Sequence, residues 1–163
     1  MIRKATENDL SSITMIYNQA IESRKATADT ETLSIEQRKL WFLSQSKERT
    51  PIFVYEDCGT VLGYCYLFEY RFGRKAFIDT AEISYYIDYS HHRKGTAGNL
   101  VRHTIDAAKD LGYKNLLALL LSCNNGSIAL LKKFQFELWG TLPDIAVIDG
   151  NVYSHCYYGL KLN

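Results

Sequence analysis

Residues 80–111 read TAEISYYIDYSHHRKGTAGNLVRHTIDAAKDL, and this stretch decides the fold. Its first eight residues alternate in polarity, which predicts a β-strand with two different faces. The apolar face consists of Ala81, Ile83, Tyr85 and Ile87. The opposite face consists of Glu82, Ser84 and Tyr86. A carboxylate, a hydroxyl and a phenol on one strand face indicate the lining of a functional site.

A basic loop with small residues follows this strand and leads into a helix. The apolar residues keep the helical period from Leu100 to Leu111, so we expect a helix that begins near Gly98 and ends at Gly112. Such a helix N-terminus suits a pyrophosphate, because its backbone N–H groups and its dipole favour anions. Small residues would let the phosphates approach closely, and two cations add positive charge. These residues are Gly95, Ala97 and Gly98, and Arg93 and Lys94.

This loop motif alone is not specific, because a glycine-containing turn between a strand and a helix is more often only a turn. Two nucleotide-binding motifs are excluded on detail. No Lys-Ser/Thr pair follows a late glycine as in a P-loop, and the first strand carries no Gly-x-Gly-x-x-Gly.

The rest of the chain supplies the order of the elements. We expect strands at 2–5, 52–55, 61–70, 116–121, 136–141 and 152–162. We expect further helices at 10–21, after Ser34 and at 128–134, and a surface loop at 24–33. The order is therefore strand, helix, helix, three strands, helix, strand, helix, two strands. It predicts an α/β fold with a mixed sheet that has most of its antiparallel pairs early in the chain.

Composition narrows the class of protein. The 163 residues are 47% hydrophobic and 23% charged, which suits a single globular domain over residues 1–163. A net charge of +1 favours neither nucleic acid nor an anionic membrane as a partner. The longest apolar run, Leu116 to Leu121, is too short to span a bilayer, and the first residues do not resemble a secretory signal. Four cysteines without close pairing predict reduced thiols, a cytoplasmic location and no bound metal.

The chain resembles the GNAT superfamily of acetyltransferases over nearly its whole length. The superfamily signature Arg/Gln-x-x-Gly-x-Gly/Ala stands here as His92-Arg93-Lys94-Gly95-Thr96-Ala97. More narrowly, the chain resembles the phosphinothricin and methionine-sulfoximine N-acetyltransferases. The matching stretches are Ile16–Asn18, Ala26-Thr27, Trp41-Phe42, Arg74–Phe77, Thr80–Tyr86 and Asn124–Ser127, with Leu130 and Lys133 at the expected spacing.

This resemblance implies a GNAT-type acyl-CoA N-acyltransferase fold, a mixed and mostly antiparallel sheet flanked by helices. It also implies transfer of an acetyl group from acetyl-CoA to the amino group of a small molecule, an amino acid or an analogue, by a homodimer. Three positions depart from the family pattern. His92 replaces the usual Arg or Gln, Gln135 replaces a glycine, and Leu131 stands where many members carry the tyrosine that protonates the leaving thiolate.

The resemblance also assigns the coenzyme contacts. Tyr85, Tyr86 and Ile87 would offer backbone groups to the pantetheine arm, which lies along the strand like an added one. The pyrophosphate would lie on the loop from His92 to Gly98, which includes Thr96. Asn124 would hydrogen-bond the arm, and Lys133 would lie near the coenzyme.

Acetyl transfer to an amine requires removal of a proton, because most amines are charged at pH 7. Glu82 is the candidate base, since it is the only acid on the polar face of its strand, and partial burial would raise its pKa. The alternative is a solvated strand carboxylate; the family match favours the base. For the acid end of the substrate, Arg71 and Arg74 precede the strand, and a guanidinium suits a carboxylate. Arg74 is preferred, because it matches the family position.

Three other functions compete with this interpretation. Cys123 could be an acyl-accepting nucleophile, although a thiol after a buried strand is more often inert. The chain could be a non-catalytic acyl-CoA-binding module, which would have no need for Glu82. It could also acetylate a protein N-terminus or lysine, although no clustered acidic surface for a lysine-rich target is evident in the sequence.

Overall fold

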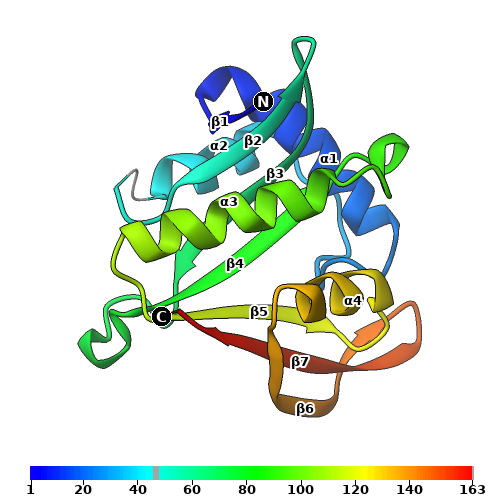
Figure 1. Cartoon of the computed structure of the whole chain (residues 1–163). Coiled ribbons are helices and arrows are strands. Elements are labelled where there is room, and N and C mark those ends of the chain that lie inside the picture. Colours follow the sequence, from blue (N-terminus) through cyan, green and yellow to red (C-terminus); the bar gives the residue numbers. More distant parts are fainter. Residues whose placement is uncertain (46–47, 163) are drawn as a thin grey trace.

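The computed structural model describes residues 1–45 and 48–162; residues 46, 47 and 163 of the predicted domain lie outside it. Within the described residues, one sheet has the strand order β1-β2-β3-β4-β5-β7-β6 (Figure 1). The strands are β1 (Ile2–Lys4), β2 (Ile52–Asp57), β3 (Thr60–Glu69), β4 (Thr80–Ile87), β5 (Asn115–Leu121), β6 (Glu137–Ile148) and β7 (Asn151–Lys161). Only β4 and β5 run parallel; the other neighbours are antiparallel. This confirms the predicted mixed, mostly antiparallel sheet.

Helices cover both faces of the sheet. On one face lie α1 (Leu10–Glu22) and α2 (Ile35–Ser44), and on the other lie α3 (Thr96–Asp110) and α4 (Asn125–Lys133) (Figure 1). Each pair of helices buries its own core. Leu100 and Leu131 belong to the α3/α4 core, whereas Ile13 and Tyr64 belong to the α1/α2 core. Because successive side chains of β4 point to opposite faces, Ala81 and Ile83 contribute to the α3/α4 core, and Tyr86 packs against the α1/α2 core.

Two helices begin earlier than the sequence predicted. The start of α3 is Thr96 rather than a residue near Gly98, because Gly95 adopts a left-handed conformation (φ 87°) and becomes the N-cap. The start of α4 is Asn125 rather than Ile128, because the side-chain oxygen of Asn124 accepts a hydrogen bond from the backbone N–H of Ser127 at 3.2 Å. Both caps depend on the loop conformation, which apolar periodicity does not report.

The edge strand β6 is longer than the predicted 136–141. Its pairing with β7 is irregular between Leu142 and Ala146 and then resumes to Ile148. Pro143 and Asp144 (φ 55°) lie in this irregular part. A bulge on an edge strand tolerates a proline, because no second strand needs its N–H. The Trp139 ring lies so close to Gly159 of β7 that a Cβ there would be 2.0 Å from the ring.

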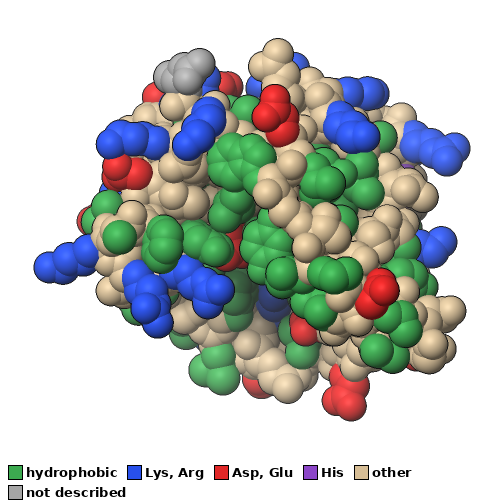
Figure 2. All heavy atoms as spheres, turned by 90° about the horizontal axis from the view of Figure 1, so that it is seen from below, with side chains coloured by type: hydrophobic (Ala, Val, Ile, Leu, Met, Phe, Trp, Pro, Cys, Tyr) green, Lys and Arg blue, Asp and Glu red, His purple; other side chains and the backbone are tan. Residues whose placement is uncertain are grey.

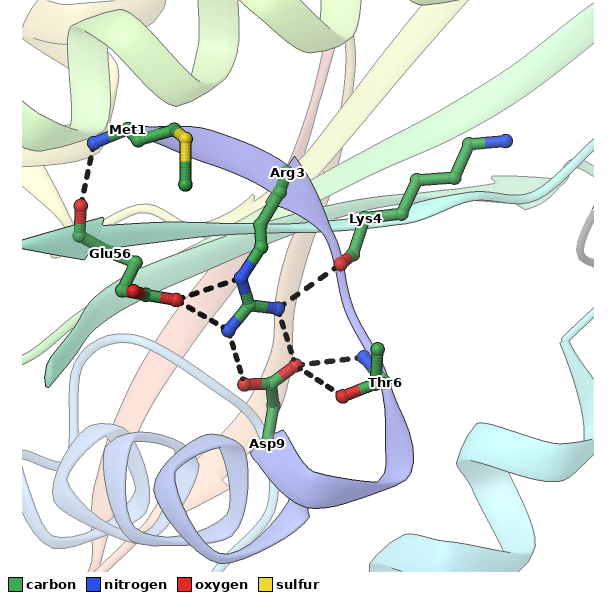
Figure 3. Close-up of polar contacts among 6 residues, drawn as sticks. All are labelled: Met1, Arg3, Lys4, Thr6, Asp9 and Glu56. Carbon is green, nitrogen blue, oxygen red and sulfur yellow. Dashed lines mark hydrogen bonds and ion pairs between the residues drawn. The ribbon is translucent and has the colours of Figure 1, made fainter. Parts of the chain in front are cut away.

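One polar cluster ties the N-terminus to the sheet (Figure 3). Arg3 of β1 donates two hydrogen bonds of 2.8 Å to the Asp9 carboxylate, and its Nε donates to Glu56 at 2.7 Å. The backbone N–H of Thr6 also donates to Asp9, at 2.7 Å. Asp9 is buried in the short helix η1 (Glu7–Asp9), so it joins β1, β2 and the start of α1.

We predict that Asp9→Asn lowers the free energy of unfolding by about 1.5–3 kcal/mol at pH 7, because it breaks charge-assisted hydrogen bonds. The bonds from Arg3 hold the pKa of Asp9 below its usual value. The ionised carboxylate therefore stabilises the fold above about pH 4, and this contribution is lost as pH falls through the lowered pKa. Urea unfolding from pH 7 to pH 3 measures both effects. The exposed Asp106→Asn is the control; equal losses in the two variants would contradict the assignment.

Candidate active site

The strands β4 and β5 separate soon after they begin. Their ladder contains only three pairs and ends where Glu82 lies opposite Leu117. From Ile83 to Ile87, β4 pairs with β3 on one side and has no partner strand among the described residues on the other. Figure 1 shows the two strands diverging, with α4 beside the open side of the gap. An extended ligand can therefore add to this edge of β4 by main-chain hydrogen bonds.

A cleft of about 1020 Å³ lies at this gap. We call it the β4–α3 cleft. The predicted coenzyme contacts line it, with the exception of Lys94, and they are Tyr85, Tyr86, Ile87, His92, Arg93, Gly95, Thr96, Ala97, Gly98, Asn124 and Lys133. The structure thus brings together residues that are up to 48 positions apart in the sequence, from Tyr85 to Lys133. The loop, the strand and the α4 cap form one site.

The charges that line the cleft favour an anionic ligand. Its described lining includes the cations Lys25, Arg93, Arg102 and Lys133, and no Asp or Glu. The N-terminus of α3 opens into it, and its N-cap Gly95 carries no side chain that would cover the first N–H groups. This combination fits the pyrophosphate and pantetheine of a coenzyme A molecule, with the phosphates at α3 and the arm along β4.

His92 secures the loop against the strand. Its Nε2 lies 3.0 Å from the backbone oxygen of Ile87. Its ring packs edge-on against the Tyr89 ring, with 4.4 Å between the ring centres. This residue, which departs from the family pattern, therefore engages the Ile87 carbonyl in addition to lining the cleft. Gln135, the second departure, adopts φ 64° and follows Phe134, the C-cap of α4. That left-handed conformation is the physical reason why a glycine is common at such a position.

Sequence reasoning missed several residues of the cleft. Arg102 lies four positions after Gly98 on α3, and its guanidinium is 5.2 Å from the centre of the Phe134 ring. The i, i+4 spacing could have placed Arg102 on the cleft side of the helix. Lys25 and Ala26 come from the loop after α1, and no local pattern predicts their position.

The candidate base lies beside the gap. Glu82 is half-buried at the last paired position of β4, on the same strand face as Ser84 and Tyr86. Opposite them on β3 are Phe68, Tyr66 and Tyr64. Burial raises the pKa of Glu82, and the positive charge of Arg71 opposes the rise. Glu82 therefore has the partial burial that a base on this strand requires.

The two arginines differ in their surroundings. Arg71 (φ 52°) lies over the Tyr70 ring at 5.7 Å, and its charge acts on Glu82. Arg74 is exposed at the start of the short helix η2 (Lys75–Phe77). The sequence preferred Arg74 as the substrate contact, and of the two arginines it is Arg71 whose charge lowers the pKa of Glu82.

The cysteine alternative gains no support. Cys123 is half-buried after β5, and within the described part of the chain no histidine hydrogen-bonds its thiol. In residues 1–45 and 48–162 no three His, Cys, Asp or Glu side chains are grouped so that they could hold a metal ion. No helix in those ranges is long and apolar enough to cross a membrane.

Comparisons with known proteins agree with this geometry. Residues 2–156 match the family model of the acetyltransferase (GNAT) domain. An L-methionine sulfoximine/L-methionine sulfone acetyltransferase of Pseudomonas aeruginosa is 31% identical over 99% of this chain and 94% of its own. An N-acetyltransferase from Staphylococcus aureus Mu50 superposes with a TM-score of 0.95 at 36% identity, over 100% of this chain and 98% of that one. A phosphinothricin acetyltransferase from Sinorhizobium meliloti, solved in complex with AcCoA, superposes with a TM-score of 0.94 at 26% identity. The superposition covers 100% of this chain and 88% of that one.

We predict that Gly95→Glu weakens coenzyme A binding by more than about 100-fold, because it places a negative charge where phosphates would lie. Isothermal titration calorimetry measures the affinity. Gly112→Glu is a matched control: it lies at the other end of α3, also has a positive φ (81° against 87°), and also has open space where a Cβ would lie. Both changes cost similar backbone strain. Equal affinity in the two variants would move the phosphate site elsewhere.

Proposed function

The chain belongs to the GNAT acetyltransferase family and uses acetyl-CoA, and we propose that it acetylates the amino group of a small amino acid or a close analogue, with Glu82 as the base. Acetyl-CoA supplies an activated acetyl group as a thioester. The residues of the β4–α3 cleft would hold its phosphates and arm. Glu82 would take the proton of the attacking amine, directly or through one water.

The half-buried Glu82 at the end of the β4–β5 ladder carries this proposal. A coenzyme arm along β4 would place its thioester toward the point where the strands meet, which is where this carboxylate lies. Burial moves the pKa of Glu82 toward the range in which a carboxylate accepts a proton well. Transfer would be direct, since Cys123 lacks a histidine partner in the described residues.

The acid end of the acceptor would bind an arginine near Glu82. Figure 2 shows a hollow on one face of the molecule, with acidic side-chain atoms and basic side chains beside it and hydrophobic side chains around it. A zwitterionic amino acid needs such a pair of opposite charges. Relatives named for methionine sulfoximine and phosphinothricin, both amino-acid analogues, support this acceptor class.

An acceptor screen tests the proposal. Purified protein is incubated with acetyl-CoA and amino acids, simple amines, or peptides with a free N-terminus or lysine, and the released thiol is measured. Turnover with amino acids and none with peptides is expected. Turnover only with peptides would instead assign a protein acetyltransferase. If the protein bound the coenzyme but acetylated no acceptor, it would be a non-catalytic acyl-CoA-binding module.

We predict that Glu82→Gln lowers kcat by about 10²–10⁴-fold at pH 7, because the amide cannot accept the proton. The deficit should shrink as pH rises, since the amine then loses its proton unaided. Steady-state rates from pH 6 to pH 10 measure this, and the exposed Glu137→Gln is the control. A variant with a normal pH–rate profile would show that Glu82 is not the base.

We predict that substitutions of Arg71 and Arg74 change the pH dependence of kcat/KM in different ways. The charge of Arg71 lowers the pKa of Glu82, so Arg71→Ala should move the acid limb of kcat/KM to higher pH. Arg74→Ala should leave that limb in place and mainly raise the acceptor KM, because it removes a contact made equally in ground and transition states. If the acid limb of kcat/KM did not shift in Arg71→Ala, the charge of Arg71 would not act on the catalytic base. An unchanged KM in Arg74→Ala for amino acids, with simple amines equally active, would argue against an amino-acid acceptor.

The homodimer implied by the resemblance and the cytoplasmic location inferred from the cysteines stay predictions. Exposed apolar side chains on the edge strand β6 and the start of β7 support the dimer, because such an edge is usually covered. They are Leu138, Trp139, Leu142, Ile145, Val147 and Val152. Sedimentation velocity measures the oligomeric state.

A further inference from the structure

Acetyl transfer has a second chemical requirement besides a base. When the C–S bond of a thioester breaks, the electron pair leaves on sulfur, and a hydrogen-bond donor placed there lowers the barrier. Leu131 of α4 is fully buried and carries no donor. The donor must therefore come from another element that faces the β4–α3 cleft.

Five aromatic side chains in the described lining can donate a hydrogen bond, and they are Tyr85, Tyr86, Tyr89, His91 and His92. Tyr89, His91 and His92 lie at the loop before α3, which is the phosphate end of the cleft. Tyr86 lies on the opposite face of β4 and packs against the α1/α2 core. Of these five, Tyr85 has its side chain on the α3/α4 side, where Asn124 and Ser127 of the α4 cap are further donors.

The phenol of Tyr85 reaches the first turns of α4. Its hydroxyl donates to the backbone oxygen of Ser127 at 3.5 Å, and both residues line the cleft. Ser127 and Leu131 are four positions apart and share one face of α4. The hydroxyl thus lies next to the helix face that Leu131 occupies, although it is supplied from β4. A hydrogen bond of 3.5 Å is long, so a better acceptor can replace it.

We propose that Tyr85 is a catalytic residue whose hydroxyl donates a hydrogen bond to the leaving sulfur of the acetyl donor. This rests on the proposed function. In the step, the amine nitrogen forms a bond to the carbonyl carbon, the C–S bond breaks, and Glu82 takes the amine proton. The electron pair remains on sulfur, which accepts the hydrogen bond from Tyr85 and later takes its proton from water.

The phenol acts as a donor and keeps its proton. Burial raises the pKa of Tyr85 above its usual value near 10. A thiol has a pKa of about 8.5, so complete proton transfer from this phenol to a thiolate is unfavourable. A phenol that stays protonated through the whole working pH range can donate a hydrogen bond at every turnover.

Tyr85→Phe tests the proposal, because it removes the hydroxyl and keeps the ring and the backbone. We expect kcat to fall about 10–100-fold, the usual size for a hydrogen bond to a charged group, while the affinity for acetyl-CoA changes less than about 2-fold. The control is Tyr55→Phe, which removes a phenol packed against the same core outside the cleft. Turnover in Tyr85→Phe equal to that of the control would overturn the proposal, as would a loss of affinity that accounts for the whole effect.

A second measurement does not depend on turnover. The thiol of bound coenzyme A is titrated by its ultraviolet thiolate absorbance in wild type and in Tyr85→Phe. A hydrogen bond to the thiolate lowers the pKa of the thiol, so the variant should hold a thiol with a pKa at least about one unit higher. Equal thiol pKa values would refute a contact between Tyr85 and the sulfur, even if no acceptor were known.

Rescue from the neighbouring helix completes the test. Leu131 is buried in the core and does not line the cleft, but it shares a face of α4 with Ser127, so Leu131→Tyr in the Tyr85→Phe background tests whether a phenol on α4 can replace that of Tyr85. Thermal unfolding shows whether the buried site accepts the larger ring, and recovery of kcat in a folded double variant is expected. If wild type transferred no acetyl group to any acceptor, the proposed function would fail, and the thiol titration would still decide the role of Tyr85.

Discussion

The early end of the β4–β5 ladder is the constraint on which the site depends. Backbone N–H and C=O groups that lose a partner strand must find other partners. After Glu82, β4 leaves β5, and the resulting gap leads to the N-terminus of α3 and to the Asn124 cap of α4. The same divergence therefore creates an unpaired main-chain edge on β4, a cationic cleft at one end of it, and a half-buried carboxylate at the other.

Alternate side chains of β4 point to opposite faces of the sheet, so the two proposed catalytic side chains lie on different faces. Glu82 projects to one side of the sheet, where Arg71 is the charge that acts on it, whereas Tyr85 projects to the other side toward α4. The described cleft lining is cationic and has no acid, so phosphates bound there and the proposed base Glu82 would not compete for the same charges. In the proposed reaction, a proton acceptor and a hydrogen-bond donor would then approach one reacting centre from opposite faces of a single strand.

The side of β4 that carries Glu82 has a rigid support. Arg38 of α2 is buried, with its guanidinium 3.6 Å from the centre of the Trp41 ring and 4.2 Å from that of Tyr17. Its Nη2 donates to the hydroxyl of Tyr64 at 2.7 Å, and Tyr64 lies opposite Tyr86 across the β3–β4 ladder. These contacts lock α1, α2 and β3 together behind the polar face of β4, so the proposed base Glu82 would be held in place at little entropic cost.

The sequence by itself determined the elements whose signals are local. Alternation predicted β4 at Thr80–Ile87 without error, helical spacing predicted α3, and the loop composition predicted an anion site at Gly95, Ala97 and Gly98, which line the cleft. Only the tertiary structure decided where β5 leaves β4, how far β6 continues past Pro143, that Arg71 rather than Arg74 acts on Glu82, and that Tyr85 reaches Ser127. The physical reason is that periodicity reports which face of an element is buried, whereas strand register and loop conformation depend on partners far away in the sequence.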